Sequence, residues 1–209
     1  MIRGIVSDLD GTLINTAGIL AEAWAQAFKV SGILLGPDEL LKNTKGLAPK
    51  DILKKYKVGE TDLKKLLSIR KAEALKLIKS NPSILYPETL DFLNEVKHRK
   101  IKIAVATGMS RDLLRDVLET SGINGLLDAV VSSDDVAHGK PEPDIFIEAF
   151  NRISINPKEG LVLGDSENDI IPGHGIGALT VFISRDGANL PSADRSVSNL
   201  MDILDLLKY

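Results

Sequence analysis

Two aspartates near the start of the chain have the spacing of a catalytic pair. Asp8 and Asp10 follow a short apolar run and stand at alternate positions of the segment Asp8-Leu9-Asp10-Gly11-Thr12-Leu13. If this segment is extended, alternate side chains project to the same side, so the two carboxylates face one space. Two close carboxylates favour either a bound cation or a division into an acid and a base. The alternative interpretation is a solvated acidic turn after a strand.

A second acidic cluster, Gly164-Asp165-Ser166-Glu167-Asn168-Asp169, follows another apolar run. Asp165 could complete a metal site with the first pair, and Asp169 could support it, because hard cations such as Mg²⁺ take carboxylate oxygens as ligands. An acidic helix start favoured by the helix dipole explains Asp165 or Glu167 almost as well. Two acidic strand ends in one sheet make that simpler explanation less attractive.

Two further segments carry groups suited to binding an anion. Thr107-Gly108 closes an apolar run and leads toward a helix, where a hydroxyl and a backbone N–H form an anion site. Lys140 lies in Gly139-Lys140-Pro141-Glu142-Pro143-Asp144, where it could hold a phosphoryl group or neutralise a nucleophile. Taken singly, the first is also a common turn and the second is also a surface lysine.

The elements that must position these residues alternate between strands and helices. Short apolar runs, each followed by a Gly, Asp or Ser cluster, predict buried strands, and helical patterns lie between them. This alternation predicts a parallel sheet covered by helices on both faces, with ligands bound beyond the carboxyl ends of the strands. The predicted strands are 2–7, 101–106, 129–131, 161–164 and 180–183.

Several helix ends are also predicted. Pro87 suits the first turn of a helix, and Ser110 and Gly122 suit the start and the end of another. Ser198 is expected to cap a last helix that buries four apolar residues: Leu200, Ile203, Leu204 and Leu207.

One region breaks the alternation, because residues 15–82 contain no strand-like run. Helical patterns at 17–30 and 61–80 are separated by glycine and proline. We expect a helical cap domain over residues 15–82, inserted into an α/β core domain of residues 1–14 and 83–209.

Composition excludes several classes of protein. The chain has 209 residues, no cysteine and a net charge of −3, so disulfides and thiolate sites are excluded and nothing favours nucleic acid. The first apolar run is too short for a signal peptide, and no segment approaches the roughly 20 apolar residues of a membrane span. We expect a cytoplasmic monomer or homodimer without a nucleic-acid or membrane partner.

The four chemical segments together resemble, in order and spacing, the haloacid dehalogenase superfamily across essentially the whole chain. Residues 8–13 match its D-x-D-G-T-L motif, Thr107 its second motif, Lys140 its G-K-P-x-P lysine, and residues 164–169 its G-D-S-x-N-D motif. The resemblance implies a three-layer, Rossmann-like α/β core with a parallel sheet. The helical insert resembles the small cap of phosphoglycolate-phosphatase-like and β-phosphoglucomutase-like members. The chain departs from the family pattern at Glu88, where a glycine is frequent.

The resemblance also implies a mechanism. Asp8 would attack phosphorus and become an aspartyl phosphate, while Asp10 would protonate the leaving oxygen and then deprotonate water. Thr107, the Gly108 N–H and Lys140 would bind the phosphoryl oxygens. Because the family's dehalogenases lack an acid at the position of Asp10, phosphoryl chemistry is favoured.

The resemblance implies Mg²⁺ as cofactor, held by the Asp8 carboxylate, the Asp10 backbone carbonyl and Asp165, with Asp169 behind or beside it. Lys45 lies in a turn that resembles the family's substrate-specificity loop and could meet a carboxylate on the substrate, although an exposed cap lysine is an equally simple interpretation. The predicted function is therefore a phosphatase for a small metabolite such as phosphoglycolate or a sugar phosphate. A phosphomutase of the β-phosphoglucomutase type is the alternative, and a non-catalytic binding module is a remote one.

Overall fold

The core of the protein is one parallel sheet of six strands. The computed structural model describes residues 1–44, 49–81 and 84–207. The strands lie in the order β3-β2-β1-β4-β5-β6, and every neighbouring pair is parallel. Their bounds are β1 Gly4–Ser7, β2 Lys102–Ala106, β3 Ala129–Val131, β4 Gly160–Gly164, β5 Leu179–Ile183 and β6 Arg195–Val197. The five predicted strands are confirmed, with shifts of one or two residues at some ends.

The sixth strand was not predicted. The residues of β6 are exposed or half-buried, and β6 pairs only with β5 at one edge of the sheet. An edge strand is covered less than a central one, so its sequence needs no continuous apolar run. The apolar pattern therefore finds the central strands and misses this one.

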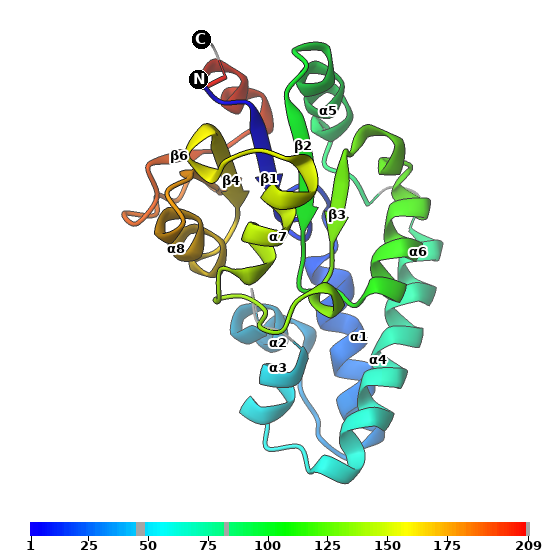
Figure 1. Cartoon of the computed structure of the whole chain (residues 1–209). Helices are drawn as coiled ribbons and strands as arrows, with labels where there is room; N and C mark the ends of the chain where they lie inside the picture. Colours follow the sequence, from blue (N-terminus) through cyan, green and yellow to red (C-terminus); the bar gives the residue numbers. More distant parts are fainter. Residues whose placement is uncertain (45–48, 82–83, 208–209) are drawn as a thin grey trace.

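Helices cover both faces of the sheet, as predicted (Figure 1). The cluster containing Ile5 and Leu161 packs against α5 (Thr89–His98) and α6 (Arg111–Ser121). On the other face Val6 and Val162 belong to a second cluster with α7. Successive residues of β1 and β4 thus face opposite layers, as the two-residue period of a strand requires. The helices of this second face are α7 (Asp144–Ile153) and α8 (Glu167–Gly175).

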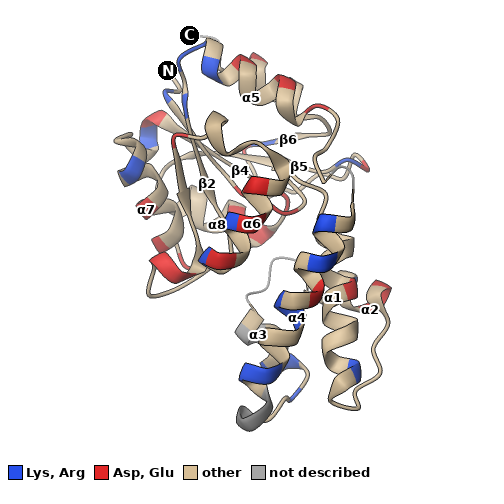
Figure 2. Ribbon diagram, turned by 90° about the vertical axis from the view of Figure 1, so that its right-hand side faces the viewer, with Lys and Arg blue, Asp and Glu red and all other residues tan. Residues whose placement is uncertain are grey.

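Four helices, α1–α4, form a separate apolar cluster beyond one end of the sheet. In Figures 1 and 2 they extend below the sheet, and the chain termini lie at the opposite end. Trp24 and Phe28 of α1 are buried in this cluster together with Leu40 of α2 and Leu66 of α4. On this arrangement we propose the division into a cap of residues 15–82 and a core of 1–14 and 83–209. The helix bounds are α1 Ala17–Val30, α2 Pro37–Thr44, α3 Pro49–Lys55 and α4 Glu60–Ser80.

The predicted helix ends are partly correct. Gly122 adopts a left-handed conformation (φ 71°) and ends α6, whereas Ser110 occupies the N-cap position without a side-chain hydrogen bond. The helix expected at Pro87 begins at Thr89. The prediction for Ser198 is wrong.

The last element is a 3₁₀-helix, η4 (Leu200–Asp205), and its cap is Asn199, whose Oδ1 accepts a hydrogen bond from the Met201 N–H at 2.8 Å. Asparagine and serine cap helices about equally well. Asn199 is the cap because it, and not Ser198, stands directly before the first helical residue. The four apolar residues of this segment are buried as predicted. Three further 3₁₀-helices are η1 Asn124–Leu126, η2 Ser133–Asp135 and η3 Pro157–Glu159. No helix within the described residues has both the length and the apolar character to cross a membrane.

Candidate active site

The predicted site residues meet at the carboxyl end of the sheet. Asp8 follows β1, Thr107 follows β2 and Asp165 follows β4, and β1 lies between the other two strands. One cavity of about 140 Å³ opens there, between the sheet and the cap helices. Seven of the eight predicted residues line it: Asp8, Asp10, Thr107, Gly108, Lys140, Asp165 and Asp169. The eighth, Lys45, lies outside the described residues.

Lys140 sits between two buried carboxylates. Its Nζ lies 2.5 Å from Asp8 Oδ1 and 2.7 Å from Asp169 Oδ1, and the three side chains are at most 10% exposed. Burial opposes the charge on Lys140, but Asp169 and Asp8 raise its pKa above the ordinary value, so it remains a cation at neutral pH. Burial, together with the carboxylates of Asp169, Asp165 and Asp10, raises the pKa of the Asp8 carboxyl well above its ordinary value, and Lys140 opposes that shift. Among these groups, Lys140 is therefore the one that favours the ionised form of Asp8.

Three carboxylates at this point fit a hard cation. Ligand oxygens of Asp8, Asp165 and Asp169 lie within 4.8 Å of one another, and all-oxygen donors suit Mg²⁺. One lysine balances only part of their negative charge, so a divalent cation would neutralise the remainder. Gly11 makes the close approach possible: its φ is +81°, and a Cβ there would lie 2.2 Å from Asp165 Oδ2.

Asp169 also belongs to the start of helix α8. Its Oδ2 accepts hydrogen bonds from the Ser166 hydroxyl at 2.7 Å and from the Ser166 N–H at 3.2 Å, and the two residues form a capping box. The acidic helix start is therefore observed, with Glu167 and Asp169 in the first turn of α8, and Asp169 also lines the cavity. The capping box holds the Asp169 carboxylate in place, and its other oxygen, Oδ1, contacts Lys140.

Asp10 is held by groups that the sequence analysis did not identify. The Thr16 hydroxyl donates a hydrogen bond to Asp10 Oδ1. Burial raises the pKa of Asp10, while this hydrogen bond and the charges of Arg70 and Lys140 lower it. The net shift is upward, which favours the protonated form of this carboxyl. Arg70 belongs to cap helix α4 and lines the same cavity, and no local pattern in its sequence marked it.

Arg185 holds the loop that carries the two aspartates. Its guanidinium donates hydrogen bonds to the carbonyl oxygens of Gly11 and Thr12, both at 2.8 Å, and to Glu88 Oε1 at 3.1 Å. It also lies 3.2 Å from the centroid of the Tyr86 ring. Glu88, the departure from the family pattern, is thus a partner of this arginine.

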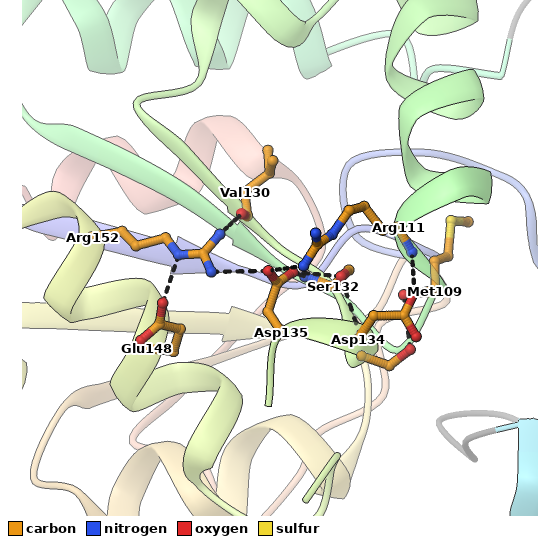
Figure 3. Close-up of polar contacts among 9 residues, drawn as sticks. Met109, Arg111, Val130, Ser132, Asp134, Asp135, Glu148 and Arg152 are labelled. Atoms are coloured by element: carbon orange, nitrogen blue, oxygen red, sulfur yellow. Dashed lines mark hydrogen bonds and ion pairs between the residues drawn. The ribbon is translucent and has the colours of Figure 1, made fainter. Parts of the chain in front are cut away.

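A polar network joins the loops after β2 and β3 (Figure 3). Asp135 is its centre: Oδ2 accepts a hydrogen bond from the Ser132 N–H at 2.8 Å, and Oδ1 meets Arg111 at 2.7 Å and Arg152 at 3.0 Å. Burial opposes ionisation of Asp135, but the Ser132 hydrogen bonds and Arg152 hold its pKa below the ordinary value.

The same network reaches the phosphate-binding segment. Asp134 accepts a hydrogen bond from the Arg111 N–H at 2.8 Å, and the Ser133 N–H and hydroxyl each donate to the Met109 carbonyl at 3.0 Å. Met109 follows Thr107 and Gly108 directly, and its N–H donates to Thr107 Oγ1 at 3.2 Å. The network therefore positions the segment expected to bind phosphoryl oxygens.

Replacing Asp135 with asparagine should lower the free energy of unfolding by about 1–3 kcal/mol at neutral pH. Because the folded pKa is below the ordinary 3.8, the ionised form stabilises the fold above pH 3.8, and this contribution is lost as the pH falls further. Urea unfolding of wild type and variant from neutral pH to below pH 4 measures the difference, which should shrink with acidity. Asp202→Asn, on an exposed residue, is the control. A constant difference would contradict the assignment.

Comparison with known proteins identifies the family of the chain. A family model described as haloacid dehalogenase-like hydrolase matches residues 5–183. The pyrophosphatase PpaX of Oceanobacillus iheyensis is 26% identical over 99% of this chain and 97% of its own. The validoxylamine A 7'-phosphate phosphatase of Streptomyces hygroscopicus subsp. limoneus is 25% identical over 97% and 96%.

Solved structures share the fold. The β-phosphoglucomutase of Clostridium difficile superimposes with a TM-score of 0.86 at 23% identity, covering 99% of this chain and 96% of that one. CbbY from Rhodobacter sphaeroides, in complex with phosphate, gives 0.84 at 22%, covering 97% and 96%. The predicted α/β fold is confirmed. Because the family model spans most of the sheet and all four motif segments, the chain belongs to the haloacid dehalogenase-like hydrolase family.

Proposed function

We propose that the protein is a magnesium-dependent phosphatase that hydrolyses a small phosphorylated metabolite through an aspartyl phosphate on Asp8. The observation that carries the proposal is the buried Asp8 carboxylate, in contact with Lys140 and within 4.8 Å of two further carboxylates. The curated relatives named as phosphatases support the same class.

In the first step an Asp8 oxygen attacks phosphorus and forms the new P–O bond while the bond to the leaving oxygen breaks. Asp10 donates its proton to that oxygen, so the leaving group departs as an alcohol or acid. Asp10 then takes a proton from water, which attacks phosphorus and releases inorganic phosphate and the free Asp8 carboxylate. Lys140, the Thr107 hydroxyl and the Gly108 N–H hold the phosphoryl oxygens, since such reactions depend mainly on positioning and charge stabilisation.

Asp8, Asp165 and Asp169, with the Asp10 backbone carbonyl, are the groups that would hold Mg²⁺. When bound, the ion supplies positive charge next to the transferring phosphoryl group. The chain's own residues supply the nucleophile, the acid and the remaining phosphoryl contacts.

The natural substrate is proposed to be small. Phosphoglycolate and a sugar phosphate are the candidates from the sequence, and the relatives named as pyrophosphatases add pyrophosphate. The cavity of about 140 Å³ is below the roughly 300–1,000 Å³ of pockets for drug-sized ligands. The proposed contact of Lys45 with a substrate carboxylate stays a prediction, and unchanged phosphoglycolate kinetics in Lys45→Ala would contradict it.

The test is magnesium-dependent phosphate release from a panel of phosphoglycolate, pyrophosphate, sugar phosphates and nucleotides. Release that needs Mg²⁺ and favours a small ester or anhydride is the expected result. Activity that depends on an added sugar bisphosphate and returns the phosphoryl group to sugar would establish the phosphomutase alternative. Tight binding without turnover of any ester would establish the binding module.

Replacing Asp10 with alanine should lower kcat by about 10²–10⁴-fold, because both proton transfers lose their carboxyl group. With 4-nitrophenyl phosphate, whose leaving group needs little protonation, the variant should release a burst of about one nitrophenol per active site and then stall. Acid quench and mass spectrometry should find the phosphoryl group on Asp8. Steady turnover at the wild-type rate, without a burst, would contradict the role of Asp10.

A further inference from the structure

We infer that Arg70 forms a binding site in the cap for a second anionic group on the leaving-group side of the substrate. The favoured substrates are then short phosphate esters or anhydrides whose leaving group carries a carboxylate or a second phosphate. This inference rests on the proposed phosphatase function and narrows its substrate class.

Arg70 is a buried cation for which the described part of the chain offers no fixed anionic partner. The residue is 8% exposed, and its Nε is buried and has no hydrogen-bond partner. No ion pair joins it to a carboxylate among the described residues. A buried charge of this kind is costly unless an opposite charge meets it. The carboxylate whose charge acts on it is Asp10, which the proposed mechanism cycles between its charged and neutral forms.

Arg70 lines the same cavity as the proposed nucleophile, Asp8. Asp8, Asp10 and Lys140 form the core side of the cavity, and Arg70 belongs to the cap side. Lys140 is occupied by two carboxylates. Among the described lining residues, Arg70 is therefore the cation left to meet a group that extends from the transferred phosphate toward the cap.

The other described parts of the cap wall are mostly apolar. The cavity is lined on this side by large apolar or aromatic side chains: Leu20, Trp24, Leu41 and Ile52. Besides Arg70, the described residues of this wall include the hydroxyl of Thr44. Each buried hydroxyl without a partner costs about 1–3 kcal/mol. A sugar with several hydroxyls is poorly matched to this wall, whereas a compact leaving group with one anionic end matches it.

Trp24 supports the guanidinium of Arg70 from one side. The guanidinium carbon lies 5.4 Å from the centroid of the Trp24 ring, within the range of a cation–π contact. A planar guanidinium held in this way offers parallel N–H groups to two oxygens of a carboxylate or phosphate. Trp24 thus belongs to the cap core, as its apolar helical pattern indicates, and also supports the proposed anion site.

Another role for Arg70 has to be separated from this one. Because the charges of Arg70 and Asp10 act on each other, the arginine could serve only to adjust the proton affinity of Asp10. Its loss would then slow every substrate by the same factor and would shift the pH profile of kcat. A site for a second anion instead makes the loss depend on the substrate.

The experiment compares phosphoglycolate and pyrophosphate with ethyl phosphate, whose leaving group is short and uncharged. In Arg70→Met, which keeps a long apolar side chain against Trp24, kcat/KM should fall about 10- to 100-fold more for the anionic substrates than for ethyl phosphate. Arg70→Lys keeps the positive charge but loses the two parallel N–H groups of the guanidinium. Its kcat/KM for the anionic substrates should lie between those of wild type and Arg70→Met. Lys76→Met, on an exposed lysine of the same helix (73% side-chain exposure), is the matched control. If phosphoglycolate shows the larger loss of kcat/KM, the natural anionic group is a carboxylate, and if pyrophosphate does, it is a phosphate.

A binding measurement makes the test independent of turnover. Calorimetry with the Asp8→Asn variant should show tighter binding of phosphoglycolate or pyrophosphate than of ethyl phosphate, and adding Arg70→Met should remove that preference. An equal loss for all three ligands, or no loss for any, would overturn the inference. Wild-type protein that releases phosphate from no ester would overturn the proposed function instead, while the binding arm would still decide the role of Arg70.

Discussion

Asp8→Asn should abolish magnesium-dependent phosphate release, with kcat lowered on the order of 10⁴- to 10⁶-fold. Asparagine keeps the shape of the side chain but is not a nucleophile at phosphorus, so the aspartyl phosphate cannot form. The fold should persist, because Lys140 keeps its contact with Asp169 at 2.7 Å. Phosphate release and acid-quench mass spectrometry of the phosphoryl-protein measure the effect.

The control for this variant is Asp202→Asn, the same exchange on an exposed residue, which should keep full activity. Thermal unfolding of both variants checks that neither has lost its structure. Substantial phosphatase activity in purified Asp8→Asn, at a level above that of a mock preparation, would remove Asp8 as the nucleophile and with it the proposed mechanism.

Lys140→Met should have the second largest effect, because it combines a loss of activity with a loss of stability. Removing the cation that contacts Asp8 and is proposed to bind the phosphoryl oxygens should lower kcat by about 10²–10³-fold. Two buried carboxylates, Asp8 and Asp169, would also be left without their shared partner. Breaking a buried pair in this way costs about 3–5 kcal/mol, which urea unfolding in the presence of a chelator measures.

A double variant tests the cause of that loss. Lys140→Met with Asp169→Asn removes one of the two unpaired charges, so it should regain part of the stability but none of the activity. Lys76→Met is the control for the lysine exchange. If the double variant were no more stable than Lys140→Met, the stability lost in Lys140→Met would come from altered packing and not from the unpaired charges.

The sheet could be predicted from the sequence because its central strands are buried on both faces. Such strands need continuous apolar residues, and β1 and β4 carry them, ending at acidic clusters. Alternating helices then leave few topologies open, since parallel strands require crossover connections. The edge strand β6 lacked that signal because its residues are half-exposed.

The positions of the motif residues at one edge of the sheet could be predicted for a related reason. Asp8, Thr107 and Asp165 each follow a strand that the apolar pattern locates, and the parallel arrangement brings such ends together. Lys140 lies in a loop, so its place came from the family resemblance. The structure adds that its Nζ contacts both Asp8 and Asp169.

The sequence by itself therefore determined the fold class, the helical segment between β1 and β2 and the groups around Asp8, the proposed nucleophile. The tertiary structure alone decided which side chains from distant segments reach the site, such as Arg185 on the carbonyl oxygens of Gly11 and Thr12 and Arg70 in the wall of the cavity that Asp10 also lines. Neither arginine stands in a local pattern that distinguishes it from a surface cation. A side chain acquires a partner 60 or more positions away only through the packing of the helices and loops that carry it, and that packing is set by the whole chain.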